Sequence, residues 1–488
     1  MRKAICTQQR LDCASVERVK LNLECRDEII PVLRGLQHIY SRPTLRDEIL
    51  RLVAEDVNRD TRDDCGRQGL DLWQILVLAA VRLGCGLNYD KLQDLAEQHR
   101  TLRHVMGVGD WDEDANFNWR RIRDNVCLLQ PVTIEQISHL VSAAGHRLVP
   151  QAIHKVRADS FVVETNIHHP TESSLILDGT RKVLELSTEL AQIFELPGWR
   201  QQAHCLKKIR QLVRGIGRHA RSQSEKRKQQ VKELYQKLLR RAATILNRAG
   251  ELVEALETGV KLDPASVARV AELQVFIAQT QHVCGTAHRR VVLGEKVPNS
   301  EKLFSIFEPH TQLYKRGKAG KPVQFGRLVL IYEDQAGFVV HHHVLPRDAQ
   351  DRDVAVDQTR QLQERVNGQI RELSFDAGFH SPENQADLAK LVQHPCLPKL
   401  GSHQAAAQRE KASVRFRQAR QRHPGVESAI GALQAGNGLK RSRDRSVLGF
   451  ERYVVLGILG RNIHTLGKLL IQREDASCEA ACSYRATG

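Results

Sequence analysis

The first 150 residues carry apolar positions at the spacing of amphipathic helices. The clearest pair of helical segments runs from Leu70 to Leu83 and from Asn88 to Gln98, with Gly84 and Gly86 between them. Asn88 suits the N-cap of the second segment because its side-chain oxygen can accept from backbone N–H groups of the first turn. The pattern predicts a helical N-terminal domain over residues 1–150.

The turn between these two helices is sharp enough for a helix-turn-helix, whose second helix would enter a DNA groove. That helix also carries Asp90, Asp94 and Glu97, which would repel phosphate. Most two-helix turns in helical proteins serve packing alone. We therefore favour a helical assembly and DNA-binding domain that contacts DNA elsewhere, with the segment Trp119–Arg123 as the candidate.

From Ile153 the pattern changes to β-branched residues typical of a strand, and this strand carries Asp159. Long helical periodicity then runs from Val183 to about Arg290, with few strand signals. Strand texture returns at 322–332 and 337–345, which are joined by a polar turn containing glycine and predict a hairpin. A sheet thus begins near residue 153 and is interrupted by a helical insertion.

A polar, helix-like stretch over 351–369 precedes a short predicted strand at 370–375 that ends at Asp376. Ser381-Pro382-Glu383 then has the N-cap, first-turn proline and first-turn acid of a new helix. This order of elements predicts an α/β fold whose strands converge on one edge. The expected parts are a helical region at 1–150, an α/β domain at 151–181 and 301–472, a basic helical insertion at 182–300 and a tail at 473–488.

The composition is that of a globular protein, with 41% apolar and 27% charged residues over 488 positions. The apolar runs stay short of membrane-spanning length, and the first residues lack the apolar core of a secretion signal. We therefore expect a soluble, cytoplasmic protein with no membrane segment. The eleven cysteines include no Cys-x-x-Cys pair, which argues against both a disulfide framework and a zinc module.

A net charge of +16 favours a polyanionic partner, because each Lys or Arg that binds a phosphate releases a counterion. The segment 200–241 holds fourteen Lys or Arg residues against two Glu, a local charge of +12. A solvated helix face normally mixes both signs of charge, so we favour a DNA-phosphate surface in this segment. The candidate DNA-binding residues here are Lys207, Lys208, Arg210 and Arg214.

Three acids have the surroundings expected of a metal site. Asp159 lies within a β-branched strand, Asp376 ends the strand before Gly378, and Glu427 begins a helix but lies off its apolar stripe. Phosphodiester chemistry commonly uses two divalent ions held by carboxylates, and Mg²⁺ takes its remaining ligands from water and substrate phosphate. The three acids therefore form a candidate catalytic and metal-binding set.

Each acid also has an ordinary structural interpretation. Asp159 could pair with Arg157 or Arg181, Asp376 could cap the turn that follows it, and Glu427 could interact with its helix N-terminus. Other acids in the chain could serve equally well by residue type alone, namely Glu164, Asp178, Glu308, Asp334 and Asp353. The order of strand, strand and helix within a basic chain is what favours the first set.

Several segments resemble bacterial insertion-sequence transposases of the DDE class, in the group labelled ISNCY and related elements. They include Phe-Asp-Ala-Gly-Phe-His-Ser at 375–381 and His-Pro-Gly-Val-Glu-Ser-Ala-Ile at 423–430. The likeness covers roughly residues 70–470, and the further segments that carry it are 158–179, 307–311, 438–445 and 459–464. The chain departs from this family at Phe379, where Tyr is commoner, and in the unusual length of the insertion after Asp159.

The resemblance implies an RNase H-like catalytic domain in which Asp159, Asp376 and Glu427 bind Mg²⁺ or Mn²⁺. It also implies that basic residues lie near transposon-end DNA, and the matching positions are Lys318, Arg441, Arg443 and Arg445. The implied reaction cleaves transposon ends and joins their 3′-OH groups to target DNA. Pairing of two ends would require at least a dimer on double-stranded DNA.

Two other functions fit the same residues. A nuclease without strand transfer would use the same acids, and the sequence does not separate it from a transposase. A catalytically silent DNA-binding protein descended from a transposase is the second alternative. Retention of all three acids argues against the silent protein, because a protein freed from catalysis would have no reason to keep them.

Overall fold

The structure, a computed structural model, is a mixed α/β protein that contains two compact units. One unit comprises Met1–Asn166 with Arg327–Gly488, and the other comprises Ile167–Gly326. The described residues are 2–4, 11–59, 69–112, 115–259, 261–315, 323–399, 401, 404, 408 and 413–486, with side chains described to residue 476.

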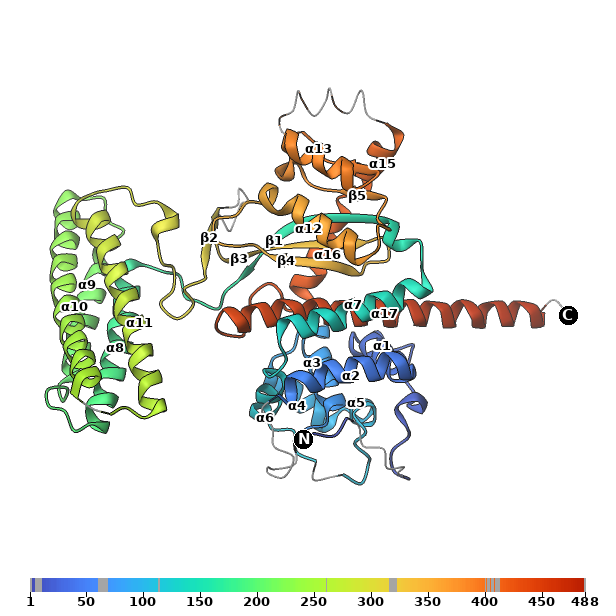
Figure 1. Ribbon diagram of the computed structural model, residues 1–488, viewed down its shortest axis with the longest axis horizontal. Coiled ribbons are helices and arrows are strands. Elements are labelled where there is room, and N and C mark those ends of the chain that lie inside the picture. The colour runs from blue at the N-terminus through green and yellow to red at the C-terminus, as the bar shows by residue number, and fades with distance from the viewer. Residues whose placement is uncertain are drawn as a thin grey trace. The chain divides into compact units, whose positions relative to one another are not determined.

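The first unit begins with a helical region that agrees with the predicted one (Figure 1). Helix α3 is buried along most of its length, and Asn88 caps the next helix by accepting from the backbone N–H of Lys91 at 2.8 Å. The helices are η1 Val16–Arg18, α1 Ile29–Tyr40, α2 Pro43–Val57, α3 Leu72–Gly84, α4 Tyr89–Gln98, α5 Arg100–Val105, α6 Trp119–Val126, α7 Pro131–Leu148 and η2 Ala152–His154.

A mixed sheet follows, with strand order β2-β3-β1-β5-β6 and β4 paired to β3. Strands β3 and β4 form the predicted antiparallel hairpin, whereas β1, β5 and β6 are parallel to one another. The strands are β1 Lys155–Glu164, β2 Gln312–Lys315, β3 Val323–Asp334, β4 Val339–Val344, β5 Glu372–Ser374 and β6 His394–Cys396. The α/β class predicted from the element order is thus present.

Helices of the α/β part follow the strands in the predicted order, and Ser381 caps α13 with a proline in its first turn. The last helix, α17, packs along α1, α3 and α7, so it joins the helical region to the α/β part within one core (Figure 1). The bounds are α12 Asp351–Arg365, η5 Ala377–Phe379, α13 Pro382–Leu391, α15 Val414–Arg422, α16 Gly425–Ala435 and α17 Val447–Ala486.

One helix of the described chain is long and apolar enough to cross a membrane by length and composition. It covers Val447–Ala476 of α17, and 72% of its most apolar window is buried inside the protein. Such burial is typical of the core helix of a soluble protein, because the apolar residues are already covered by neighbouring helices.

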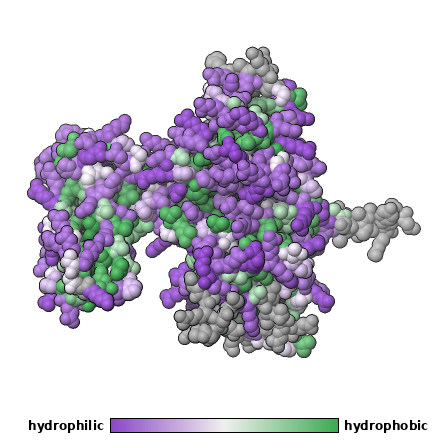
Figure 2. All heavy atoms as spheres, viewed as in Figure 1, coloured by the Kyte–Doolittle hydropathy of each residue, from purple (hydrophilic) through white to green (hydrophobic). Residues whose placement is uncertain are grey.

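The second unit is a helical bundle with its own apolar core (Figure 1). It confirms the helical periodicity predicted after residue 183, although the unit itself spans 167–326 and includes β2 and the first residues of β3. Polar surface covers much of both units on the face seen in Figure 2. The elements are α8 Glu172–Ile193, α9 Gln202–His219, α10 Glu225–Gly259, α11 Pro264–Ala287, the π-helix His288–Val292 and η4 Asn299–Glu301.

Candidate active site and nucleic-acid interface

Asp159 lies on strand β1, and Asp376 follows the neighbouring strand β5 by two residues. The parallel strands β1 and β5 pair Arg157 with Ser374, and the two aspartates lie two residues further along their respective chains. The paired register ends at Ser374, and Asp376 lies two residues beyond it with an extended backbone of φ −77° and ψ 166°. Because adjacent strands are about 4.8 Å apart, the two carboxylates can serve one ion or a close pair of ions.

The two aspartates differ in exposure. Asp159 is half-buried beside buried Ala158, and its Oδ1 accepts from the backbone N–H of Ser160 at 2.7 Å. The side chain of Asp376 is 55% exposed, and its Oδ1 lies 3.8 Å from Nη1 of Arg420. An exposed pair at that distance is screened by water and weak, so Asp376 can exchange its arginine for a cation.

Glu427 lies in the first turn of α16, a helix that packs on β1. Its side chain is exposed, whereas Val426, Ala429 and Leu433 form the buried stripe of the helix. Gly431, one turn after Glu427, has no atoms within 4 Å of a hypothetical Cβ. Glu427 therefore faces open space on the side of the helix where a substrate could lie.

Arg157 holds the start of α16 against β1. Its Nη1 donates to the carbonyl oxygen of Arg422 at 3.2 Å, and a Cβ on Gly425 would lie only 2.0 Å from the same atom. Side chains two residues apart on a strand share a face, so Arg157 and Asp159 face the same side of the sheet. The contact therefore fixes the start of the Glu427 helix next to Asp159.

His423 makes the matching contact with β5. It is buried, and its Nδ1 lies 3.2 Å from Oγ of Ser374, two residues before Asp376. Burial, followed by the positive charge of Arg420, lowers the pKa of His423 to about 4, although Asp376 opposes the shift. His423 is therefore neutral at pH 7, and Glu427 follows it by about one helical turn.

The structure thus places the three predicted acids on β1, after β5 and on α16, with Arg157, Gly425 and His423 tying these elements together. Sequence reasoning named Arg157 only as a possible partner of Asp159, and His423 and Gly425 only as part of a family-like segment. It gave none of them this positioning role. The sequence signals that could have indicated this role were the arginine two residues before Asp159 and the His-Pro-Gly turn that ends two residues before Glu427. Arg157 does not pair with Asp159 but with Glu333, at 2.6 Å.

The acids do not form a preformed metal cage. Across the described ranges, no group of three or more His, Cys, Asp or Glu side chains is close enough to hold an ion. Mg²⁺ usually keeps several waters and binds through one or two carboxylates plus substrate phosphate. Two aspartates on β1 and just after β5, with an exposed glutamate on the helix that packs on β1, are compatible with such an open site.

The other acids considered from sequence have structural partners. Asp334 lies 2.6 Å from Nε2 of His146, and Glu164 lies 3.1 Å from Nη2 of Arg441. The remaining three also have partners. Glu308 lies near His310, Asp178 lies near His168, and Asp353 accepts from the backbone N–H of Gln350. Each of the five acids thus has a protein partner.

The predicted arginine cluster lies on a loop that runs beside the end of β1. The backbone N–H of Ser442 donates to the Glu164 carbonyl at 2.7 Å. Ser442 and Asp444 point inward, and Asp444 meets Arg82 at 2.6 Å with side chains only 10% and 1% exposed. This alternation leaves the three predicted arginines exposed on the outer face, at positions Arg441, Arg443 and Arg445.

Two of these arginines share a cavity with the basic segment predicted in the helical region. The cavity, of about 620 Å³, is lined by Trp119, Arg123, Arg443 and Arg445 among others. Arg120 and Arg123 each lie near the ring of Trp119, at 5.2 and 5.3 Å from its centroid. Segments far apart in sequence thus combine into one partly aromatic surface. Five arginines line it against two aspartates, Asp90 and Asp444, and Asp444 is already paired with Arg82.

The four predicted DNA-binding residues of the insertion lie on α9, where three are exposed and one lines a cavity. Lys207, Arg210 and Arg214 are exposed, on the side away from the buried residue Ile209. Lys208 is half-buried and lines a cavity shared with α10. The remaining predicted residue, Lys318, lies outside the described residues.

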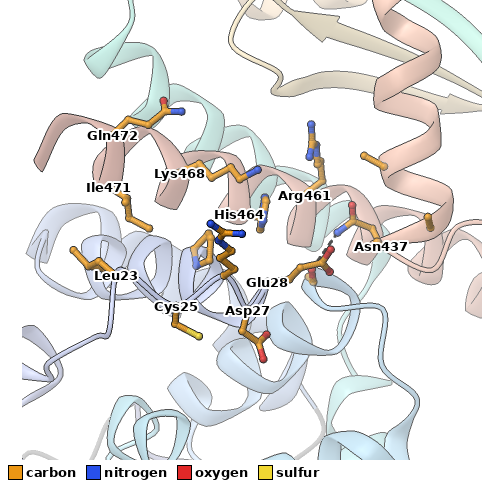
Figure 3. Close-up of a pocket in the computed structure, with 16 residues that line it drawn as sticks. Leu23, Cys25, Asp27, Glu28, Asn437, Arg461, His464, Lys468, Ile471 and Gln472 are labelled. Carbon is orange, nitrogen blue, oxygen red and sulfur yellow. Dashed lines mark hydrogen bonds between the residues drawn. The ribbon is translucent and has the colours of Figure 1, made fainter. Parts of the chain in front are cut away.

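A further cavity of about 620 Å³ lies at the other end of α16 (Figure 3). Figure 3 shows His464 and Lys468 of α17 on one wall, and Asp27 and Glu28 from the segment before α1 on another. Because its walls carry both signs of charge, this cavity lacks the uniform positive charge of a polyanion surface.

Comparison of the chain with known proteins adds no relative to this description. No protein-family model, curated protein or solved structure matches it.

Proposed function

We propose that this chain is a DDE-type DNA transposase with Asp159, Asp376 and Glu427 as its metal-binding acids. The observation that carries the proposal is the register of β1 and β5, which brings the segments that bear two distant aspartates side by side. The helix that bears Glu427 packs on the first of these strands. A strand, strand and helix origin for three acids is what the sequence resemblance requires.

The topology supports an RNase H-like interpretation of the catalytic part. The chain leaves the mixed sheet after β1, forms the helical unit, and returns through β2 into the β3–β4 hairpin. The acid-bearing strands are the parallel ones, and their carboxyl ends meet at one edge, where sites in α/β folds commonly lie. The helical unit forms the connection between β1 and β2, so its length does not disturb the pairing of the strands within the sheet.

The acids would hold Mg²⁺ or Mn²⁺, which supplies a metal-activated water and stabilises the leaving oxygen during phosphodiester cleavage. Asp159 and Asp376 would orient the scissile phosphate from the sheet edge, and Glu427 would approach it from the helix. Arg157 and His423 act as positioning residues for that helix. No nucleotide cofactor is required, because joining exchanges one phosphodiester for another.

The exposed arginine loop and the Trp119 cavity support a DNA partner for the same unit. Arg443 and Arg445 belong to both features, and the loop is anchored by the buried ion pair between Arg82 and Asp444. A preorganised row of arginines can bind backbone phosphates without the entropic cost of first ordering the loop. Joining two transposon ends would further require two copies of the chain on one DNA complex.

The direct test is cleavage of labelled duplex DNA carrying the element's own ends, in Mg²⁺ or Mn²⁺. We expect wild-type nicking to be lost in Asp376→Asn while DNA binding is retained. Asp348→Asn is a matched control, because Asp348 is an exposed aspartate after the β3–β4 hairpin. Equal nicking by wild type and Asp376→Asn would refute the acid assignment.

The same reactions distinguish the alternatives when target plasmid is added. Joined products identify a transposase, whereas nicking without joining identifies a nuclease. DNA binding without nicking by the wild type would identify a silent DNA-binding protein and overturn the proposal.

A further inference from the structure

A groove between α9 and α10 in the helical unit is lined by cations and by no acid. It has a volume of about 440 Å³. Its α10 side presents positions 237, 240, 241 and 244, and its α9 side presents positions 208, 211 and 212. Both sets follow the spacing of one helix face. The lining residues are Lys208, Gln211, Leu212, Lys237, Arg240, Arg241 and Thr244.

The charge of this groove is unbalanced. Four of its lining residues are cations and none is an acid. Elsewhere in the unit cations meet carboxylates, as Lys182 meets Glu272 at 3.0 Å and Arg269 meets Glu189 at 2.9 Å. Within the described part of the chain, none of the four groove cations has an ion pair within 4.0 Å. Their mutual repulsion would be relieved by an external anion.

Packing beneath the groove holds the cations in place. Ile209 of α9 and Leu238 of α10 are fully buried on the apolar side of their helices. Gly215 lets α9 approach α10 closely, because a Cβ there would lie 3.2 Å from Leu234. The cations therefore sit on two packed helices rather than on a loop, and binding would require little reordering of the backbone.

We propose that this groove holds the sugar-phosphate backbone of duplex DNA without reading its sequence. The choice of DNA rests on the proposed transposase function, whereas the preference for phosphate rests on the groove itself. Sequence-independent binding is carried by contacts of Lys and Arg with phosphates, and four of the seven lining residues are of these two types. No aromatic residue is present among the lining residues to stack an unpaired base.

Two variants with the same loss of charge test this proposal. The groove variant is Lys237→Gln/Arg240→Gln/Arg241→Gln, and its three positions are all exposed. The control variant is Lys226→Gln/Arg227→Gln/Lys228→Gln, which removes three exposed charges from the same helix outside the groove. Circular dichroism melting of the full chain first establishes that both variants fold.

Binding of the full chain to duplex DNA is then measured over a range of salt concentrations. We expect the groove variant to bind at least about tenfold more weakly. The slope of log K against log salt concentration should become shallower by about 0.9 for each phosphate that the groove no longer neutralises. The control should change both quantities far less. The loss of affinity in the groove variant should be equal for the element's own ends and for a scrambled duplex.

Four outcomes would overturn the inference. Equal loss of affinity in both variants would mean that the charge acts diffusely. A loss confined to the element's own ends would mean that the groove reads sequence. If the groove variant loses binding of inorganic pyrophosphate but binds DNA normally, the groove is a small-anion site. If the groove variant loses affinity for duplex RNA alone, the groove is an RNA site.

Cleavage separates this inference from the proposed function. If the groove variant binds DNA normally and the wild type still cleaves its own ends, only the groove proposal fails. If the wild type neither binds nor cleaves those ends, the transposase proposal fails.

Discussion

Replacing Arg157 with methionine should destabilise the first unit and displace the helix that carries Glu427. The Arg157 Nε lies 2.6 Å from Oε2 of Glu333, whose side chain is 2% exposed while that of Arg157 is 29% exposed. Burial raises the pKa of Glu333, and the charge of Arg157 opposes this shift. Without the arginine, a nearly buried carboxylate is left beside Arg461 alone as its other attracting charge.

The magnitude follows from the burial of the pair. Breaking a fully buried ion pair on one side costs about 3–5 kcal/mol, and the partial exposure of Arg157 together with the charge of Arg461 reduces this to about 2–3 kcal/mol. The double variant Arg157→Met/Glu333→Gln removes the stranded charge and should recover at least about 1 kcal/mol. The loss of stability in Arg157→Met relative to the wild type should shrink as the pH falls toward the raised pKa of Glu333, because protonation of that buried carboxylate relieves the cost.

Tryptophan fluorescence during urea unfolding can follow the first unit by itself. Trp73, Trp111 and Trp119 belong to this unit, and the remaining tryptophan, Trp199, belongs to the other. A Trp199→Phe background therefore isolates the relevant transition. A loss below about 0.5 kcal/mol in Arg157→Met, or no recovery in the double variant, would refute the assigned role of the pair.

Cleavage provides the second assay for Arg157. We expect Arg157→Met to nick DNA much more slowly at saturating Mg²⁺, with DNA affinity unchanged, because only the position of Glu427 is altered. Wild-type nicking in a variant that shows the expected loss of stability would mean that the contact is structural alone.

Three further predictions rest on single features of the first unit. Gly425→Ala should slow cleavage, since its Cβ would meet the Arg157 guanidinium at 2.0 Å and displace it, whereas Gly431→Ala has open space and should cleave normally. Equal cleavage by both would show that the start of α16 tolerates this displacement. Burial, aided by Arg365, lowers the pKa of His139 to about 3, and burial, aided by His343, lowers the pKa of His342 to about 4. Unfolded histidines take up protons below about pH 6.5 while these two do not, so the urea midpoint should fall between pH 6.5 and 4, and an unchanged midpoint would contradict their burial. Chelation with EDTA should stop nicking without shifting the thermal midpoint, because the three acids form no preformed cage; a large fall in the midpoint would reveal a structural ion.

Local features were predictable wherever the interactions that form them lie within a few residues of one another in the sequence. The caps at Asn88 and Ser381 fix helix starts through bonds within a few residues, and both formed as predicted. The β3–β4 hairpin needs only alternating strands and a turn. Strand β6 was not predicted, because His394–Cys396 is a three-residue strand containing a proline and exists only through its pairing with β5.

The candidate site was predictable in part. The sequence by itself determined which acids are available, the order of the elements that carry them and the segments that concentrate positive charge. It could not specify the register of β1 and β5, because pairing between strands more than 200 residues apart depends on the whole core. It also could not show that Arg157 pairs with Glu333 rather than with Asp159.

Only the tertiary structure decided which charged residues face outward. Arg443 and Asp444 are adjacent in sequence, yet Asp444 turns inward because Arg82, on a distant helix, is buried beneath it. Lys207 and Lys208 are likewise adjacent, but only Lys208 lines the groove with α10. Composition and local propensity act over a few residues, whereas exposure depends on which element packs against each face, and that is settled only when the chain has folded.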